Sequence, residues 1–148
     1  MNGSLDQDHS LEEPFSSDFR LASATIGYDF GTATLTSVTS YQSATATYTP
    51  DVTQILVPLL AQLGIVGVEA AGNTETSETK KFAQEVRIAS PSSQSLEWLV
   101  GGFYTDEKST LVSRTISYGG NFVPLPIEAY AFRSPSSYEE YAVFGNLT

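Results

Sequence analysis

The stretch Lys81–Ser109, KFAQEVRIASPSSQSLEWLVGGFYTDEKS, determines the fold class that we expect for this chain. Its first arm, Lys81–Ser90, alternates between apolar and charged side chains. The apolar residues Phe82, Val86 and Ile88 fall on one face, and the charged residues Lys81, Glu85 and Arg87 fall on the other. A period of two is typical of a β-strand with one apolar and one polar side.

The rest of the stretch predicts a β-hairpin. Pro91–Ser95 contains proline and three serines, which break a strand and favour a turn. The second arm, Leu96–Thr105, is mostly apolar and contains Trp98 and Tyr104. Two arms of about ten residues are longer than the usual five or six. They match the roughly nine to eleven residues with which a tilted strand crosses a bilayer.

Three further segments are predicted to be strands. Leu21–Phe30 alternates, and the tight turn Asp29–Thr32 follows it, with Gly31 able to adopt a positive φ. The threonine-rich segment Ala33–Tyr48 comes next, although neither of its faces is strongly apolar. Tyr138–Thr148 alternates again. The prediction is therefore an all-β chain of about five strands.

The connections between these strands alternate in length. The turns are short, whereas segments 50–79 and 111–137 do not alternate and are predicted to be long loops. In the first loop, Pro58–Gly64 is predicted to form a short helix, with proline at its first position and glycine at its end. The apolar run Ile55–Val68 could instead anchor a membrane or a partner, but a helix folded back on its neighbours is the preferred interpretation. Short turns alternating with long loops are typical of an antiparallel up-and-down meander from a transmembrane β-barrel.

The composition excludes some classes of partner. The chain has 17 acidic and 7 basic side chains, a formal net charge of -10, which argues against binding nucleic acid. Cysteine is absent, so the chain has neither disulfides nor thiolate metal sites. His9 lies among Asp6, Asp8 and Glu12, where a metal site is conceivable, but we favour a solvated acidic tail. We expect no metal site and no cofactor.

An enzyme is not expected either. A Ser-His-Asp arrangement would have to use His9, which lies in the acidic tail. Glu139 and Glu140 are adjacent in a predicted strand, so their carboxylates point to opposite faces and cannot flank one glycosidic bond.

Two of the predicted strands also resemble a known family. Phe82–Ser90, FAQEVRIAS, and Trp98–Tyr104, WLVGGFY, resemble adjacent strands of TonB-dependent outer-membrane receptors. Those receptors commonly show F-x-Q-E-[LV]-R-[LI]-x-S followed by W-x-x-G-x-[FY]-Y, and this chain has one extra residue before Phe103. Tyr28–Tyr41 and Tyr141–Asn146 look like the preceding hairpin and the following strand of the same family.

The resemblance implies a function and a location. The family forms barrels of about 22 strands with a plugged lumen, located in the bacterial outer membrane. It imports iron–siderophore complexes, cobalamin or glycans by energy-coupled transport. The expected partners are outer-membrane lipid, a plug domain, an inner-membrane energy-coupling complex and a small-molecule ligand such as an iron–siderophore. Residues 1–19 are then an acidic loop or tail, and residues 20–148 are a partial receptor barrel.

Five strands cannot close such a barrel, because both outer strands would keep unpaired backbone groups that lipid does not tolerate. We therefore expect a segment of the barrel wall that does not transport by itself. A soluble, secreted all-β module that binds carbohydrate or protein is the alternative.

The resemblance also assigns roles to individual residues. Glu85 and Arg87 should point into the lumen, where a salt bridge is a likelier role than contact with substrate. Outer loops capture ligand in this family, so the second long loop supplies the candidate ligand-binding residues Tyr118, Asn121, Phe122 and Tyr130.

Overall fold

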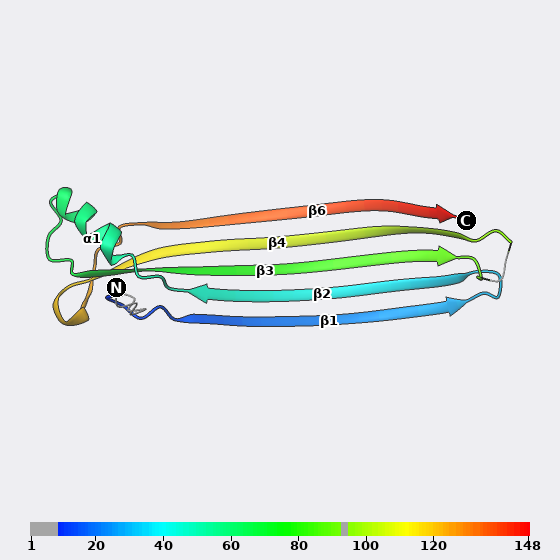
Figure 1. Ribbon diagram of the computed structural model, residues 1–148, viewed down its shortest axis with the longest axis horizontal. Helices are drawn as coiled ribbons and strands as arrows, with labels where there is room; N and C mark the ends of the chain where they lie inside the picture. Colours follow the sequence, from blue (N-terminus) through cyan, green and yellow to red (C-terminus); the bar gives the residue numbers. More distant parts are fainter. Residues whose placement is uncertain (1–8, 93–94) are drawn as a thin grey trace, which may run out of the picture. The chain divides into compact units, whose positions relative to one another are not determined.

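The computed structural model describes residues 9–92 and 95–148 and is dominated by one antiparallel sheet (Figure 1). The elements in chain order are β1 (Phe15–Asp29), β2 (Thr34–Tyr48), α1 (Thr53–Gln62), β3 (Ala70–Ala89), β4 (Trp98–Tyr118), the 3-10 helix η1 (Gly120–Phe122), β5 (Pro124–Leu125) and β6 (Ala131–Leu147). The sheet order is β1-β2-β3-β4-β5, with β6 also pairing with β4. The predicted all-β antiparallel meander is confirmed.

The turn between β1 and β2 forms as the sequence predicts. The N–H of Phe30 donates to the C=O of Ala33 at 2.9 Å. Gly31 has a φ of 81°, and its N–H donates to the Asp29 carboxylate at 2.7 Å. The positive φ explains why glycine occupies this position.

The central hairpin joins β3 to β4. The N–H of Ser90 donates to the C=O of Trp98 at 2.9 Å, and the Ser90 hydroxyl accepts from the N–H of Trp98 at 3.0 Å. Residues 93 and 94 of the predicted turn lie outside the described residues. Strand β6 then continues the sheet, since Glu97 and Thr148 exchange two backbone hydrogen bonds of 2.9 Å.

The strands are longer than the sequence pattern predicts. Strand β1 begins at Phe15, so the predicted acidic tail ends before position 19. Strand β3 already begins at Ala70 and β4 continues to Tyr118, so much of both predicted loops is strand. Strand β6 likewise begins at Ala131. The two predicted long loops therefore shorten to residues 49–69, between β2 and β3, and 119–130, between β4 and β6.

The first part of β3, which the sequence pattern misses, carries no large apolar side chain on either face. Thr47 and Thr76 join β2 to β3 by a hydroxyl–hydroxyl hydrogen bond of 3.2 Å, and Thr49 and Thr74 form another of 3.1 Å. Threonine favours strands, and a backbone ladder forms whether or not one face is apolar. Without an apolar face there is no alternating pattern for sequence reasoning to detect.

Helix α1 ends where predicted but begins earlier. Gly64 has a φ of 79°, its N–H donates to Ala61, and the N–H of Ile65 donates to Leu60, which is the Schellman arrangement. The start is at Thr53, so Pro58 lies inside the helix instead of at its first position.

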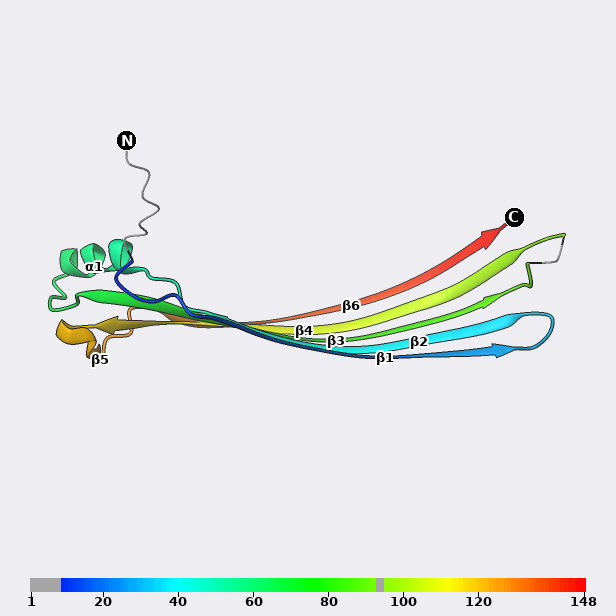
Figure 2. The same cartoon turned by 60° about the horizontal axis from the view of Figure 1, so that its bottom comes forward.

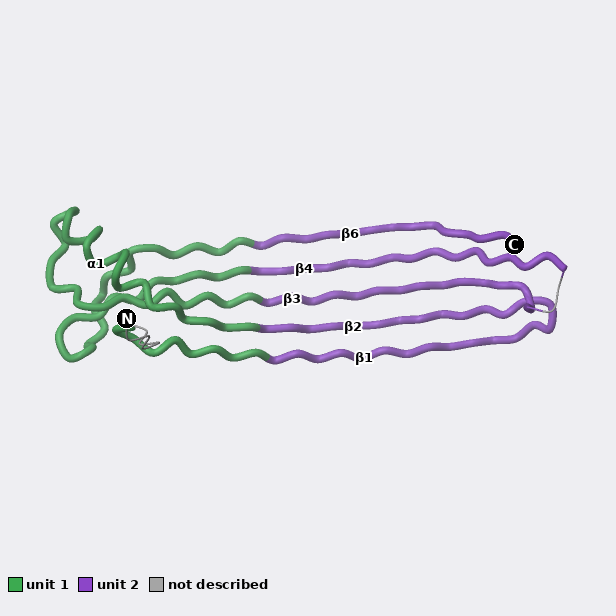
Figure 3. Tube along the Cα trace, viewed as in Figure 1, with its two compact units in different colours: residues 1–17, 46–77, 111–134 green, residues 18–45, 78–110, 135–148 purple. Residues whose placement is uncertain are grey.

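The chain divides into two compact units (Figure 3). Unit 1 comprises residues 1–17, 46–77 and 111–134. The buried apolar residues of this unit are Leu60, Val68, Ala70 and Ala71. Three hydroxyl residues of β4 in the same unit are also buried, namely Ser113, Thr115 and Ser117. Figure 2 shows α1 and β5 on opposite sides of the first residues of β3.

Two of the three buried hydroxyls of unit 1 share one acceptor, whereas the Ser117 hydroxyl has no hydrogen-bond partner among the described residues. The side-chain oxygen of Asn73 accepts from Ser113 at 3.1 Å and from Thr115 at 3.3 Å. Its amide nitrogen donates to Glu75 at 3.0 Å. Because buried polar groups are costly unless they are hydrogen-bonded, Asn73 fixes the position of β3 against β4 here.

Unit 2 comprises residues 18–45, 78–110 and 135–148, and its strands present two different faces. Gln84 of β3 is hydrogen-bonded to Thr39 of β2 at 2.6 Å, so these side chains share a face. The ring centroids of Phe82 and Tyr104 are 6.2 Å apart, and those of Tyr104 and Tyr141 are 4.9 Å apart. Alternation adds further residues to this face, which we name the apolar face: Val86, Ile88, Trp98, Val100, Val143 and Leu147.

The opposite face of unit 2, which we name the polar face, carries ion pairs. Lys81 of β3 pairs with Glu107 of β4 at 3.4 Å, and Glu85 pairs with Arg87 along β3 at 3.4 Å. The structure therefore separates the apolar and charged residues of the first arm as their period of two predicts.

Candidate functional site

The loop that follows β4 contains two residues in an unusual backbone conformation. Asn121 has a φ of 58° and Phe122 has a φ of 55°. Asparagine tolerates the left-handed region, but phenylalanine rarely adopts it. Each such residue costs about 1–3 kcal/mol and tends to occur at functional sites. The Phe122 side chain is 60% exposed, so this strain holds an aromatic ring at the surface.

A pocket of about 270 Å³ lies beside these two residues. We name it the loop pocket, and its lining residues are Ser10, Glu69, Ala70, Gly119, Asn121 and Phe122. Strand pairing brings Glu69 to the loop, because the N–H of Glu69 donates to the C=O of Tyr118 at 2.8 Å. The Glu69 carboxylate lies beside Gly120, 3.5 Å from the position that a Cβ there would take.

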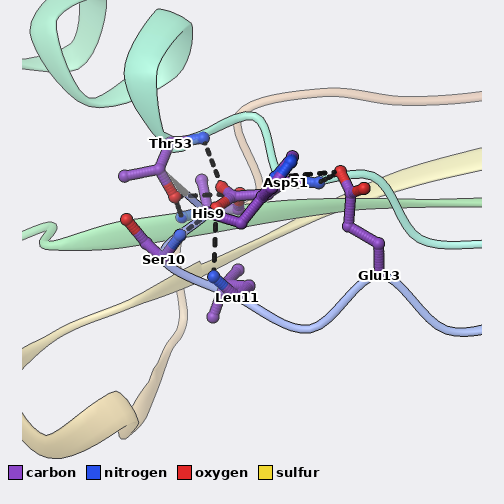
Figure 4. Close-up of polar contacts among 7 residues, drawn as sticks. His9, Ser10, Leu11, Glu13, Asp51 and Thr53 are labelled. Carbon is purple, nitrogen blue, oxygen red and sulfur yellow. Dashed lines mark hydrogen bonds and ion pairs between the residues drawn. The ribbon is translucent and has the colours of Figure 1, made fainter. Parts of the chain in front are cut away.

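The N-terminal strap, residues 10–13, supplies Ser10 to the loop pocket and is held by Asp51 (Figure 4). One carboxylate oxygen of Asp51 accepts from the N–H of Ser10 and, at 3.0 Å, from that of Leu11. The other accepts from the N–H of Thr53 at 2.9 Å. The N–H of Asp51 in turn donates to Glu13 at 2.8 Å. One carboxylate thus connects the strap to the start of α1.

The environment of Asp51 favours its charged form. Burial by itself would raise the pKa of Asp51, but hydrogen bonds from the Thr53 hydroxyl and from the backbone of Thr53, Leu11 and Ser10 together lower that pKa below its ordinary value. Beside this group, Nδ1 of His9 lies 3.5 Å from the Glu13 carboxylate.

The structure brings together two of the four predicted ligand-binding residues. Asn121 and Phe122 both line the loop pocket. Tyr118 contributes its backbone C=O to the contact with Glu69, but it is not among the lining residues. Tyr130 lies elsewhere, with its ring centroid 5.2 Å from that of Phe132.

Sequence reasoning missed Ser10 and Glu69. Ser10 is 111 positions from Asn121 in the sequence, and only the contacts of Asp51 bring it to the pocket. Glu69 precedes a strand start that the polar sequence conceals. The sequence carries no local signal for either residue, because the contacts that bring them to the pocket are made by Asp51 and by the backbone of Tyr118.

The predicted lumen-facing residues, Glu85 and Arg87, form their ion pair with each other within one strand. The half-buried Glu85 and the exposed Arg87 lie on the polar face, which is compatible with a structural role. No observation assigns them a ligand, so the lumen-facing orientation stays a prediction.

Residues 9–92 and 95–148 contain no group of three or more His, Cys, Asp or Glu side chains that could hold a metal ion. Asp6 and Asp8, which sequence reasoning considered beside His9, lie outside this part of the chain. In the same residues, no helix is both long enough and apolar enough to cross a membrane.

Comparison with known proteins adds no relative. The sequence matches no protein-family model. It also matches no curated protein.

Proposed function

We propose that this chain forms part of the barrel wall of a TonB-dependent receptor in the bacterial outer membrane. Such a receptor imports a scarce nutrient, namely an iron–siderophore, cobalamin or a glycan, by energy-coupled transport. The segment contributes wall and outer loop, and it does not transport by itself. The strand motifs at Phe82–Ser90 and Trp98–Tyr104 suggest this family, and the two faces of unit 2 support it physically.

The apolar face is the observation that carries the proposal. Its aliphatic side chains project from the sheet without a second layer over them: Val86 is 43% exposed, Val100 is 45% exposed and Val143 is 86% exposed. Aromatic residues lie at both ends of this apolar stretch, Trp98 at one end and Tyr104 with Tyr141 at the other. An apolar band between aromatic girdles is the pattern of strands that face lipid.

The polar face and the strand lengths also support the proposed barrel wall. Ion pairs such as Lys81–Glu107 on the opposite side suit a wet barrel lumen. The five long strands have 15 to 21 residues, whereas crossing a bilayer takes roughly nine to eleven. The surplus length suits strands that continue beyond the membrane towards the outer loops.

The two outer strands of the sheet support the proposed partners. Among residues 9–92 and 95–148, β1 pairs with β2 alone, and β6 pairs with β4 alone. Backbone groups along such edges must be paired within lipid. In the proposed receptor, further strands of the barrel pair with them, a plug domain fills the lumen, and an inner-membrane complex supplies energy.

Fluorescence of Trp98, the only tryptophan in the chain, tests the proposal. We expect its emission to shift to the blue in lipid vesicles and to be quenched by brominated lipids rather than by aqueous iodide. The matched control carries Trp98→Phe and Leu99→Trp, which moves the indole to the next residue and hence to the polar face. Iodide should quench this variant efficiently. We also expect the chain to depend on detergent and to show heat-modifiable migration on a gel.

Equal iodide quenching of both proteins would contradict the barrel wall. A monodisperse, cooperatively unfolding chain in plain buffer would do the same, and it would favour the soluble all-β binding module. The loop pocket is the observation that suits such a module, since all of its lining residues belong to unit 1, whereas the apolar stretch belongs to unit 2.

A further inference from the structure

We propose that the loop pocket binds one sugar ring of a glycan, with the ring stacked on Phe122 and its hydroxyls bound by Glu69 and Asn121. The inference that this sugar is the imported nutrient rests on the proposed receptor function. Binding of the sugar by the pocket does not rest on it.

The polar groups of the pocket are available to a ligand. Both Glu69 and Asn121 are exposed, and within residues 9–92 and 95–148 neither side chain has a hydrogen-bond or ion-pair partner. A carboxylate accepts hydrogen bonds through two oxygens, and an amide both donates and accepts. Together they can bind adjacent hydroxyls of one ring, each of which donates one hydrogen bond and accepts others.

Phe122 supplies the apolar surface that a sugar also needs. The C–H bonds on one side of a pyranose ring form an apolar patch that fits an aromatic face. The left-handed backbone holds the Phe122 side chain at the pocket while 60% of its surface stays exposed. An aromatic side chain with a few placed polar groups is the usual composition of a small-molecule site.

The size of the pocket selects among the nutrients of the proposed receptor. At about 270 Å³, its volume is at or below the lower end of the roughly 300–1,000 Å³ found for drug-sized ligands. An iron–siderophore or cobalamin would exceed it. One ring of a longer glycan would fit, and the rest of the glycan could extend into solvent.

The charge of the pocket excludes anionic ligands. Glu69 is the only charged residue that lines the pocket among the described residues, and the whole chain has a net charge of -10. An anionic ligand would be repelled. An organic cation would suit Glu69, but recognition of such cations uses a cage of several aromatic rings, whereas Phe122 is the one aromatic residue of this pocket in the described part of the chain.

The test measures sugar binding to the full chain by saturation-transfer NMR and titration. The probes are maltotriose, cellotriose and xylotriose, and the detergent, where needed, is free of sugar. We expect at least one trisaccharide to bind, with the strongest saturation on the C–H bonds of one ring face. Phe122→Ala should weaken binding at least tenfold, and Glu69→Gln should weaken it about threefold to tenfold.

The matched control is Phe19→Ala, which removes an exposed phenylalanine that lies outside the pocket. Its affinity should equal that of the wild-type chain. Asn121→Gly relieves backbone strain while removing the amide, so loss of binding by this variant cannot be attributed to unfolding. Far-UV circular dichroism verifies the fold of every variant.

Three results would overturn the assignment: no binding of any probe by the folded chain, equal effects of Phe122→Ala and Phe19→Ala, or preference for tetramethylammonium over all sugars. The experiments distinguish failure of the proposed sugar site from failure of the proposed barrel wall. A chain that binds sugar but dissolves in plain buffer contradicts only the receptor, and a chain that inserts in lipid but binds no probe contradicts only the sugar site.

Discussion

Asp51 is a single residue whose carboxylate connects two segments that lie about forty positions apart in the sequence. We expect Asp51→Asn to free the N-terminal strap, because the amide retains one acceptor oxygen and loses the charge. Hydrogen bonds to a charged group contribute about 1.5–3 kcal/mol each, so amide hydrogen exchange at Ser10 and Leu11 should accelerate at least tenfold at neutral pH. Mass spectrometry of the N-terminal peptide measures this.

The same carboxylate predicts a pH dependence with a defined sign. Because its pKa in the folded chain is lowered, the stability that Asp51 contributes is complete above the ordinary aspartate pKa of about 3.9 and is lost as the pH falls through the lower folded value. The difference in exchange between wild type and Asp51→Asn should therefore be constant from pH 5 to pH 7. It should disappear in stronger acid. A difference that keeps growing between pH 5 and pH 7 would contradict this role.

At the scale of elements, Gly101 of β4 leaves space for a side chain of β6. A Cβ on Gly101 would lie 2.6 Å from Cζ of Phe144 and 2.9 Å from the backbone oxygen of Val86. The ring therefore covers the bare backbone of β4. Gly102 is different, since the nearest atom to its Cβ position is the Ala142 oxygen at 3.7 Å.

This contrast gives a matched pair of variants. Gly101→Ala should destabilise the sheet by about 1–3 kcal/mol, the usual cost of overpacking. Gly102→Ala should leave stability unchanged or raise it slightly, because alanine restricts the unfolded chain. Thermal unfolding followed by circular dichroism, under the same lipid or detergent conditions, measures both. Similar melting temperatures for the two variants would show that Phe144 does not constrain Gly101.

The sequence predicts the elements with an apolar face and misses the polar ones. Phe82, Val86 and Ile88 alternate with charged residues, and that pattern locates the centre of β3 correctly. The sequence pattern does not predict the first residues of β3, because their side chains form hydrogen bonds with a threonine hydroxyl and with the buried group around Asn73. A polar side chain buried against another polar side chain leaves no hydrophobic period to detect.

The candidate site likewise combines residues that the sequence predicts with residues that it misses. Asn121 and Phe122 were accessible to prediction because an aromatic and an amide follow Gly119-Gly120 in a loop. Glu69 was not, because its place depends on the register of β3 against β4, set by its hydrogen bond to Tyr118. Local composition indicates which loop residues stand out, whereas strand pairing decides which distant residues join them.

At the scale of the whole molecule, the two faces of unit 2 make opposite demands on their surroundings. Val143 and Ala142 are neighbours on β6 and therefore project from opposite faces. In plain water, a lysine at Val143, which is 86% exposed, would be an ordinary surface substitution with an effect within about 0.5 kcal/mol. In lipid, the same lysine would be placed in hydrocarbon.

The last prediction follows from this difference. If the apolar face contacts lipid, Val143→Lys should destabilise the inserted chain by about 2–4 kcal/mol, the cost of lysine near the middle of a bilayer. Ala142→Lys should cost much less, because its charge meets water on the polar face. Urea unfolding in lipid vesicles compares the two variants with the wild type. If both lysines have the same small effect, the apolar face lies in water, and the chain is not a wall between lipid and lumen.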